Sequence, residues 1–162
     1  MKQLERLSQI LDDITSSLSG ILISVLTIAT LGGVFYRYVL GKPLDWIYEL
    51  TIVCFSWMIF LGIAMAFKKN EHIAISFVVD NLPPKASYYL RQIINLICLA
   101  FLLVAAYHGI LVTMSTMSLY YDTIPVSKGI FYLSMPISAI PASIHILVHV
   151  LRLRANYKGG RA

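Results

Sequence analysis

Charged residues are scarce in this sequence. Of its 162 residues only 13% are Asp, Glu, Lys or Arg, whereas 58% are hydrophobic, and the mean hydropathy is +0.75. Water-soluble domains are nearer a quarter charged. The composition therefore excludes a water-soluble single domain.

Cysteine is also rare. The chain has two cysteines, Cys54 and Cys98, and both lie inside apolar stretches away from any metal or redox motif. This pattern excludes the disulfide framework of small secreted domains. The net charge is +5, but charges confined to short segments between apolar runs indicate contact with lipid headgroups rather than nucleic acid.

Four stretches contain no Asp, Glu, Lys or Arg at all. They cover residues 14–36, 50–67, 92–121 and 129–151. Each reaches the roughly 17 to 25 residues that cross the hydrocarbon core of a bilayer. The sequence therefore predicts an all-α integral membrane protein, a single membrane domain over residues 1–162 with four transmembrane helices. The third stretch is long enough for its outer end to project beyond the lipid.

The first 15 residues have a different pattern. Leu4, Leu7, Leu11 and Ile14 recur at spacings of three and four, with charged residues between them. This predicts a short amphipathic helix over residues 1–15 at the membrane interface. The alternative is a solvated extension of the first span. No cleavable signal peptide is expected, and the first span would remain as an uncleaved anchor.

The basic residues are distributed unevenly between the connections. Most lie in three segments, 1–13, 68–91 and 152–162, and the rest are Arg37, Lys42 and Lys128. Because short cytoplasmic segments carry an excess of Lys and Arg, both termini and the tail over residues 152–162 are predicted to be cytoplasmic. Segments 37–49 and 122–128 then lie outside. The connection 68–91 is expected to form short helical pieces around a turn at Asn81, Pro83 and Pro84.

The spans carry no carboxylate or basic group that could bind a moving charge at membrane depth. Ion-coupled carriers need such groups. The chain is therefore predicted to be neither an autonomous carrier nor an enzyme, and no catalytic, substrate-binding or metal-binding residue is assigned. A supporting role in a larger assembly fits better.

Small residues recur at every fourth position in three spans. Such stripes let helix backbones approach closely and predict helix contacts, within the chain or with a partner. The stripes contain Ser16, Gly20 and Ser24, then Ala105, Gly109 and Thr113, then Ser134, Ser138 and Ala142.

Three histidines lie within the predicted spans. His145 and His149 are one helical turn apart, and His108 lies near the middle of the third stretch. A haem or metal site would make the chain a membrane anchor of a redox enzyme, which is the alternative function. The histidines lie at different depths in the predicted spans, which argues against one shared haem or metal. The favoured interpretation is that they form hydrogen bonds at helix contacts.

The first outer connection has the most distinctive composition. It combines aromatic residues and a Gly-Pro turn with Arg37 and Glu49 at the mouths of adjacent spans, where the two charges could pair. The alternative is an ordinary aromatic belt with charges that reach into water.

The order of the motifs resembles the small membrane subunit of tripartite ATP-independent periplasmic (TRAP) transporters. The resemblance rests on Arg37-Tyr38-Val39-Leu40-Gly41 with Trp46 and Glu49, Trp57-Met58-Ile59-Phe60-Leu61-Gly62, Glu71-His72-Ile73 with Asp80 and Leu82-Pro83, Ile124-Pro125, and Tyr132-Leu133-Ser134-Met135-Pro136. Tyr48 stands where many relatives carry an acid.

The resemblance implies a small scaffold subunit in the bacterial inner membrane. In that family a soluble periplasmic protein delivers an organic acid to a large subunit, which carries it by sodium symport. Sialic acid is the preferred cargo and a C4-dicarboxylate the next. No cofactor is implied in this chain, although a bound phospholipid is compatible with it. Arg37, Trp46 and Glu49 are expected to anchor the outer loop, and Lys42, Asp45, Asp122 and Lys128 to face the binding protein.

Overall fold

The computed structural model describes residues 2–69 and 82–158, most of which lie in four long helices. They are α1 (Lys2–Tyr38), α2 (Asp45–Lys69), α4 (Pro84–Thr116) and α5 (Lys128–Lys158). All four are long and apolar enough to cross a membrane. The prediction of an all-α membrane protein with four spanning helices is confirmed.

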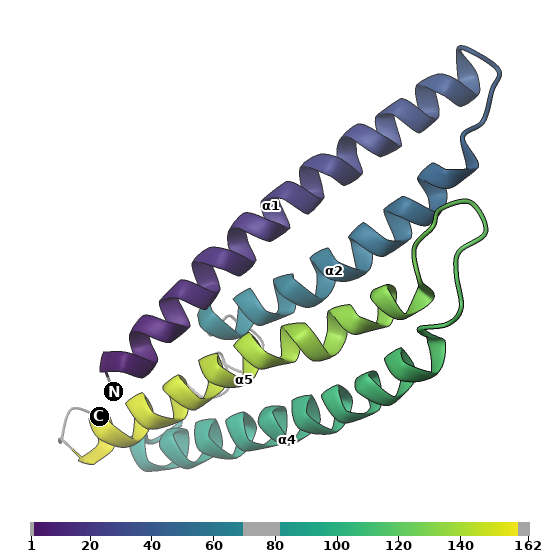
Figure 1. The fold of residues 1–162 in the computed structure, drawn as a ribbon. Coiled ribbons are helices and arrows are strands. Elements are labelled where there is room, and N and C mark those ends of the chain that lie inside the picture. The colour runs from purple at the N-terminus through teal and green to yellow at the C-terminus, as the bar shows by residue number, and fades with distance from the viewer. Residues whose placement is uncertain (1, 70–81, 159–162) are drawn as a thin grey trace.

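The helices pack side by side in the order α1, α2, α5, α4 (Figure 1). α5 contacts α2 and α4, and it also touches α1, whereas the backbone of α4 lies close to that of α5 alone within the described part of the chain. A small core of Ala64, Leu102, Ala139, Ala142 and Ile146 lies where α2, α4 and α5 meet. α2 and α5 are therefore internal, and α1 and α4 leave wide apolar faces uncovered.

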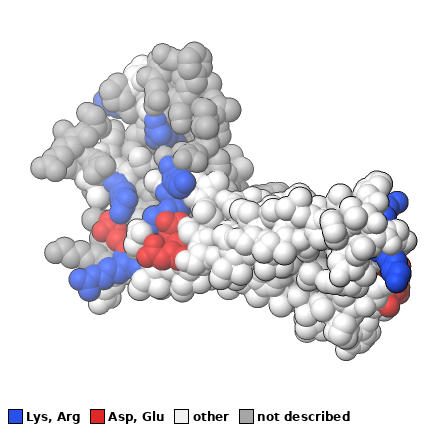
Figure 2. All heavy atoms as spheres, turned by 90° about the horizontal axis from the view of Figure 1, so that it is seen from above, with Lys and Arg blue, Asp and Glu red and all other residues white. Residues whose placement is uncertain are grey.

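α1 begins and α5 ends at the same end of the helices (Figure 1). We call this the N/C end, and the opposite end, with residues 37–49 and 116–129, the loop end. Charged side chains gather at the two ends, and the surface between them is largely free of charge (Figure 2). This distribution is typical of helices that span hydrocarbon and meet water at both ends.

Residues 2–15 are helical as predicted, but they form the first part of α1 rather than a separate interfacial helix. The sequence contains no proline or glycine before Gly20. Nothing therefore interrupts the backbone hydrogen bonds between the amphipathic segment and the span.

α4 ends at Thr116, five residues before the predicted limit at residue 121. The chain then turns back: the Lys128 amide donates to the Leu119 carbonyl at 2.7 Å, and the Tyr121 amide donates to Val126 at 3.1 Å. These bonds use backbone groups that a longer helix would need.

α5 continues to Lys158. Most of the predicted tail 152–162 is therefore helical, and residues 159–162 lie outside the described part. The segment 70–81 also lies outside it, with Asn81 of the predicted turn and the motif residues Glu71, His72, Ile73 and Asp80. Pro83 and Pro84 lie at the start of α4.

Candidate functional site

Glu49, near the start of α2, binds the second connection of the loop end. Its carboxylate accepts hydrogen bonds from three successive backbone amides, those of Asp122 at 3.0 Å, Thr123 at 2.9 Å and Ile124 at 3.1 Å. The Thr123 hydroxyl donates to the same carboxylate. Successive amides that converge on one anion form a strong local site for negative charge. Glu49 therefore fixes the α4–α5 connection to the first turns of α2.

The expected pair between Arg37 and Glu49 is not formed. The Arg37 guanidinium lies over the ring of Tyr38, 5.9 Å from its centroid, while Glu49 binds residues 122–124. Glu49 is thus an anchor of the second outer connection, not of the first. The sequence could not show this because only the packing of α2 on α5 brings residues 49 and 123 together.

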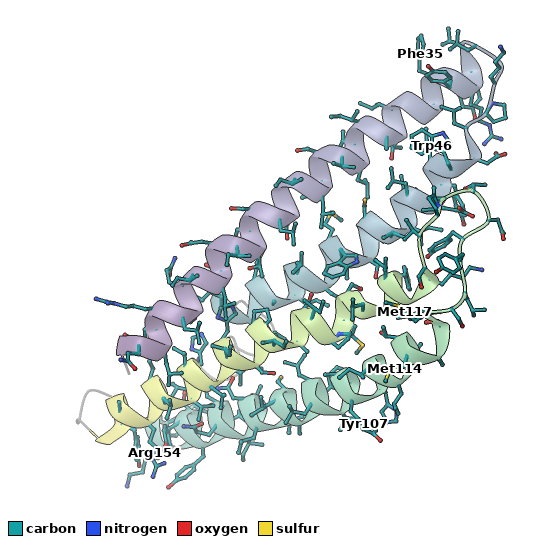
Figure 3. The ribbon with its side chains drawn as sticks, viewed as in Figure 1. Phe35, Trp46, Tyr107, Met114, Met117 and Arg154 are labelled. Carbon is teal, nitrogen blue, oxygen red and sulfur yellow. The ribbon has the colours of Figure 1, made fainter. Side chains whose placement is uncertain are left out.

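The first outer connection is held mainly by its backbone. Gly41 adopts a left-handed conformation with φ 65°, as glycine commonly does beyond the end of a helix. The Lys42 amide donates to the Tyr36 carbonyl at 3.1 Å. Lys42 is exposed. Trp46 lies at the start of α2 (Figure 3) and is also exposed.

An open cavity of about 750 Å³ lies at the loop end between α1 and α2. Four of the predicted residues line it: Arg37, Asp45, Glu49 and Asp122. With Glu49 bound to backbone amides, Asp45 and Asp122 remain as exposed carboxylates beside one arginine. A wide, open recess lined by apolar as well as charged side chains suits contact with another surface rather than enclosure of a small substrate.

The predicted docking residues do not all gather at this cavity. Lys42 and Lys128 lie outside its lining. The Lys128 ammonium lies 5.8 Å from the centroid of the Tyr121 ring. Burial raises the pKa of the Tyr121 hydroxyl, and Tyr132 and Glu49 add to this effect. Tyr121 is therefore a neutral aromatic platform for Lys128 at physiological pH.

At the N/C end a polar cluster joins α1, α2 and α5. The Ser8 hydroxyl lies 2.8 Å from Nδ1 of His145, and Lys68 Nζ donates to Ser8 Oγ at 3.0 Å and to Gln9 at 3.3 Å. His145 is only 1% exposed. This histidine forms a hydrogen bond at a helix contact, as the sequence predicted.

The histidines do not form a common site. His108 is exposed on α4 eight residues before the helix ends, whereas His145 is buried near the N/C end of α5. No group of three His, Cys, Asp or Glu side chains that could hold a metal ion occurs in residues 2–69 and 82–158.

The predicted small-residue stripes differ in what they contact. Ser134 is fully buried, and its hydroxyl lies 2.8 Å from that of Ser56 on α2. A Cβ atom on Gly109 would come within 3.1 Å of Pro136. Ala105 and Ser138 line a cavity between helices.

The α1 stripe is largely uncovered. Space is open within 4 Å of a Cβ atom placed on Gly20. Ser24 is exposed, with its hydroxyl donated to the Gly20 carbonyl, and Ser16 is partly buried. The stripes on α4 and α5 thus serve contacts within the chain, whereas Gly20 and Ser24 of the α1 stripe remain uncovered.

Two further contacts between α2 and α5 were not foreseen. The Trp57 indole donates to the Ile130 carbonyl at 3.0 Å, and Ser56 Oγ donates to the Phe131 carbonyl at 3.2 Å. The only sequence signal was the presence of two polar residues, Ser56 and Trp57, side by side in an apolar stretch.

The chain is similar to components of one transporter family. Residues 26–156 match the profile of the family described as "Tripartite ATP-independent periplasmic transporters, DctQ component". Over 96 residues, 59% of this chain and 41% of the relative, it is 26% identical to the C4-dicarboxylate TRAP transporter small permease protein DctQ of Vibrio cholerae. Over 84 residues, 52% of this chain and 49% of the relative, it is 31% identical to the Sialic acid TRAP transporter small permease protein SiaQ of the same organism.

A longer relative also matches. The Sialic acid TRAP transporter permease protein SiaT of Haemophilus influenzae is 26% identical over 127 residues, which are 78% of this chain but 20% of that protein. The chain spans about half or less of the length of the curated relatives it matches.

Proposed function

Since the chain belongs to the DctQ-component family of tripartite ATP-independent periplasmic transporters, we propose that it acts as a small scaffold subunit that supports a large transport subunit. The family consists of transporter components rather than enzymes. The chain is a multi-pass membrane protein by the length and composition of its helices.

The observation that carries the scaffold role is the lack of charge in the spans: residues 14–36, 50–67, 92–121 and 129–151 contain no Asp, Glu, Lys or Arg. The four helices form a row, in which the backbone of α4 lies close to that of α5 alone within the described part of the chain. A translocation path needs groups at membrane depth that replace the hydration shell of the moving solute. We therefore assign transport and sodium coupling to the large subunit.

The proposed cargo is an organic acid. The names of two relatives include sialic acid, and the name of a third includes C4-dicarboxylate. The SiaQ relative has the higher identity, 31% against 26% for DctQ. Sialic acid is therefore the preferred cargo, and a C4-dicarboxylate is the second candidate.

The loop end is the proposed contact for a periplasmic substrate-binding protein. Lys42, Asp45 and Asp122 are exposed there, and Glu49 holds residues 122–124 in place. Exposed charges on a fixed surface tune the rate and orientation of encounter with a soluble partner. A transient, salt-sensitive contact would suit repeated delivery.

The proposed location is the bacterial inner membrane with both termini in the cytoplasm. The start of α1 and the end of α5 lie at the same end of the helices (Figure 1). The excess of basic residues in segments 1–13, 68–91 and 152–162 favours the cytoplasmic side for that end.

Reconstitution tests the proposal. Proteoliposomes would contain this chain alone, the large subunit alone, or both, with the binding protein and a sodium gradient. We expect sodium-dependent uptake of sialic acid only with both membrane subunits. Uptake by this chain alone would overturn the scaffold role, and uptake of succinate in place of sialic acid would reassign the cargo. Absorbance near the Soret region in the purified chain would instead support the redox-anchor alternative.

A further inference from the structure

A second cavity lies in the membrane-spanning part of the chain, on one side of the row of helices. Its volume is about 130 Å³, and its lining includes Phe60 and Ile63 of α2, Phe101 and Ala105 of α4, and Ser138 of α5. α2 and α4 both pack on α5, so the cavity is a groove with α5 as its floor. We call this side of the helix row the groove face. Phe101 is 69% exposed, so the groove opens outward.

The floor of the groove contains a hydroxyl group without a partner. Ser138 is only 3% exposed, and its Oγ makes no hydrogen bond. Ser134, one turn earlier on α5, bonds to Ser56 and to the Phe131 carbonyl. Burial of a polar group without a partner is costly, and an acyl chain of a lipid cannot supply one.

A second polar group lies on the same side of α4. His108 follows Phe101 by seven residues, so the two side chains project from nearly the same side of the helix. His108 is exposed within the apolar stretch. Its ring meets Tyr107 edge-on with centroids 5.4 Å apart, a contact that is not a hydrogen bond.

The two polar groups lie at similar depths. A Cβ atom on Gly109, next to His108, would come within 3.1 Å of Pro136 and 3.3 Å of Met135. Ser138 is two residues beyond Pro136, which is about 3 Å along the helix axis at 1.5 Å per residue. Polar side chains at membrane depth normally face protein rather than lipid. Two independent groups therefore mark the groove face as covered by protein.

Resting on the function proposed above, we propose that the groove face receives a transmembrane helix of the large subunit, with a hydrogen-bonding side chain at the level of Ser138 and His108. The relative SiaT supports this occupant, because the segment similar to this chain makes up only 20% of that permease protein. The same kind of segment thus occurs within a much longer permease chain. A lipid tail would leave both polar groups unpaired.

Site-specific photo-crosslinking tests whether the groove face contacts the large subunit. The photoreactive residue p-benzoylphenylalanine would replace Phe101 on the groove face or Leu103 as a matched control. Leu103 is also exposed, at 59%, and it projects about 200° around the same helix. With the large subunit co-expressed, we expect an adduct of the two subunits from position 101 and little from position 103.

Three results would overturn the proposed face: subunit adducts from position 103 only, adducts between two copies of this chain from position 101, or no protein adduct from either position while the wild-type chain still co-purifies with the large subunit. Failure of the wild-type chain to co-purify would instead count against the proposed function. The two failures are therefore distinguishable.

Substitution of the polar groups provides a second test. His108→Leu changes an exposed side chain, so the fold and thermal stability of this chain should remain. We expect several-fold less large subunit to co-purify with His108→Leu, and less again when Ser138→Ala is added. Ile110→Leu, an exposed position on another side of α4, serves as the control. Equal recovery of the large subunit with all variants would overturn the proposed contact.

Discussion

The hydroxyl of Ser8 lies 2.8 Å from Nδ1 of His145, although 137 residues separate the two in sequence. Lys68 Nζ donates to the same hydroxyl at 3.0 Å. A lysine ammonium can only donate, so the Ser8 hydroxyl accepts from Lys68 and also bonds to Nδ1 of His145. Three helices, α1, α2 and α5, are therefore joined at one hydroxyl.

This relationship predicts that Ser8→Ala destabilises the chain. The substitution leaves Nδ1 of buried His145 without its hydrogen-bond partner, which costs about 1–3 kcal/mol. Thermal unfolding of the purified chain in detergent would measure the loss. Ser17→Ala, at an exposed position of α1, is the matched control. Equal melting temperatures for the two variants would contradict the role of Ser8.

Gly129→Ala should also destabilise the fold. A Cβ atom at this position would come within 3.0 Å of Met117 Cα and 3.1 Å of the Thr113 carbonyl. Both are backbone atoms, so overpacking would cost about 1–3 kcal/mol. Gly62→Ala is the control, because its surroundings are open to 4 Å. The same melting assay applies, and a neutral Gly129→Ala variant would show that α4 and α5 can separate there at little cost.

Glu49→Ala should release the α4–α5 connection. The amides of Asp122, Thr123 and Ile124 donate to this carboxylate, so their protons should exchange with solvent several-fold faster in the variant. Hydrogen–deuterium exchange with mass spectrometry measures this directly. Asp45→Ala removes a neighbouring carboxylate at the start of the same helix and should leave those amides protected. Unchanged exchange in Glu49→Ala would rule out the anchor.

Reversal of the charges at Lys42, Asp45, Asp122 and Lys128 should weaken delivery by the binding protein. We expect the half-maximal binding-protein concentration in proteoliposome uptake to rise by roughly tenfold at low salt, because rim charges act mainly on association. Lys85→Glu, at the opposite end of the protein, should leave that concentration unchanged. An unaltered value for the combined variant would place docking entirely on the large subunit.

Single cysteines at positions 45, 85 and 123 should report orientation. In a background without Cys54 and Cys98, an impermeant thiol reagent on spheroplasts with an intact inner membrane should label positions 45 and 123 and spare position 85. The expectation follows from the bias of basic residues toward the N/C end. Labelling at 85 but not at 45 would reverse the topology.

The sequence by itself determined the four spanning helices. Charge-free stretches of sufficient length cannot remain in water and must satisfy their own backbone in lipid, so their location follows from composition alone. Local chemistry also determined the turn after α1, where Gly41 takes a left-handed conformation. The ends of the helices were less well predicted. α4 ends at Thr116 because the backbone of Leu119 pairs with that of Lys128, which the sequence does not show.

Only the tertiary structure decided which polar groups meet. Glu49 was expected to face Arg37 across a short loop, yet it binds the amides of residues 122–124, because α2 packs beside α5 and not only beside α1. Small-residue stripes on α1 and α5 look alike in sequence, but Ser134 is buried and Ser24 is exposed. In lipid, apolar patterning does not distinguish a helix face that meets protein from one that meets acyl chains, so the order in which the helices pack decides these contacts.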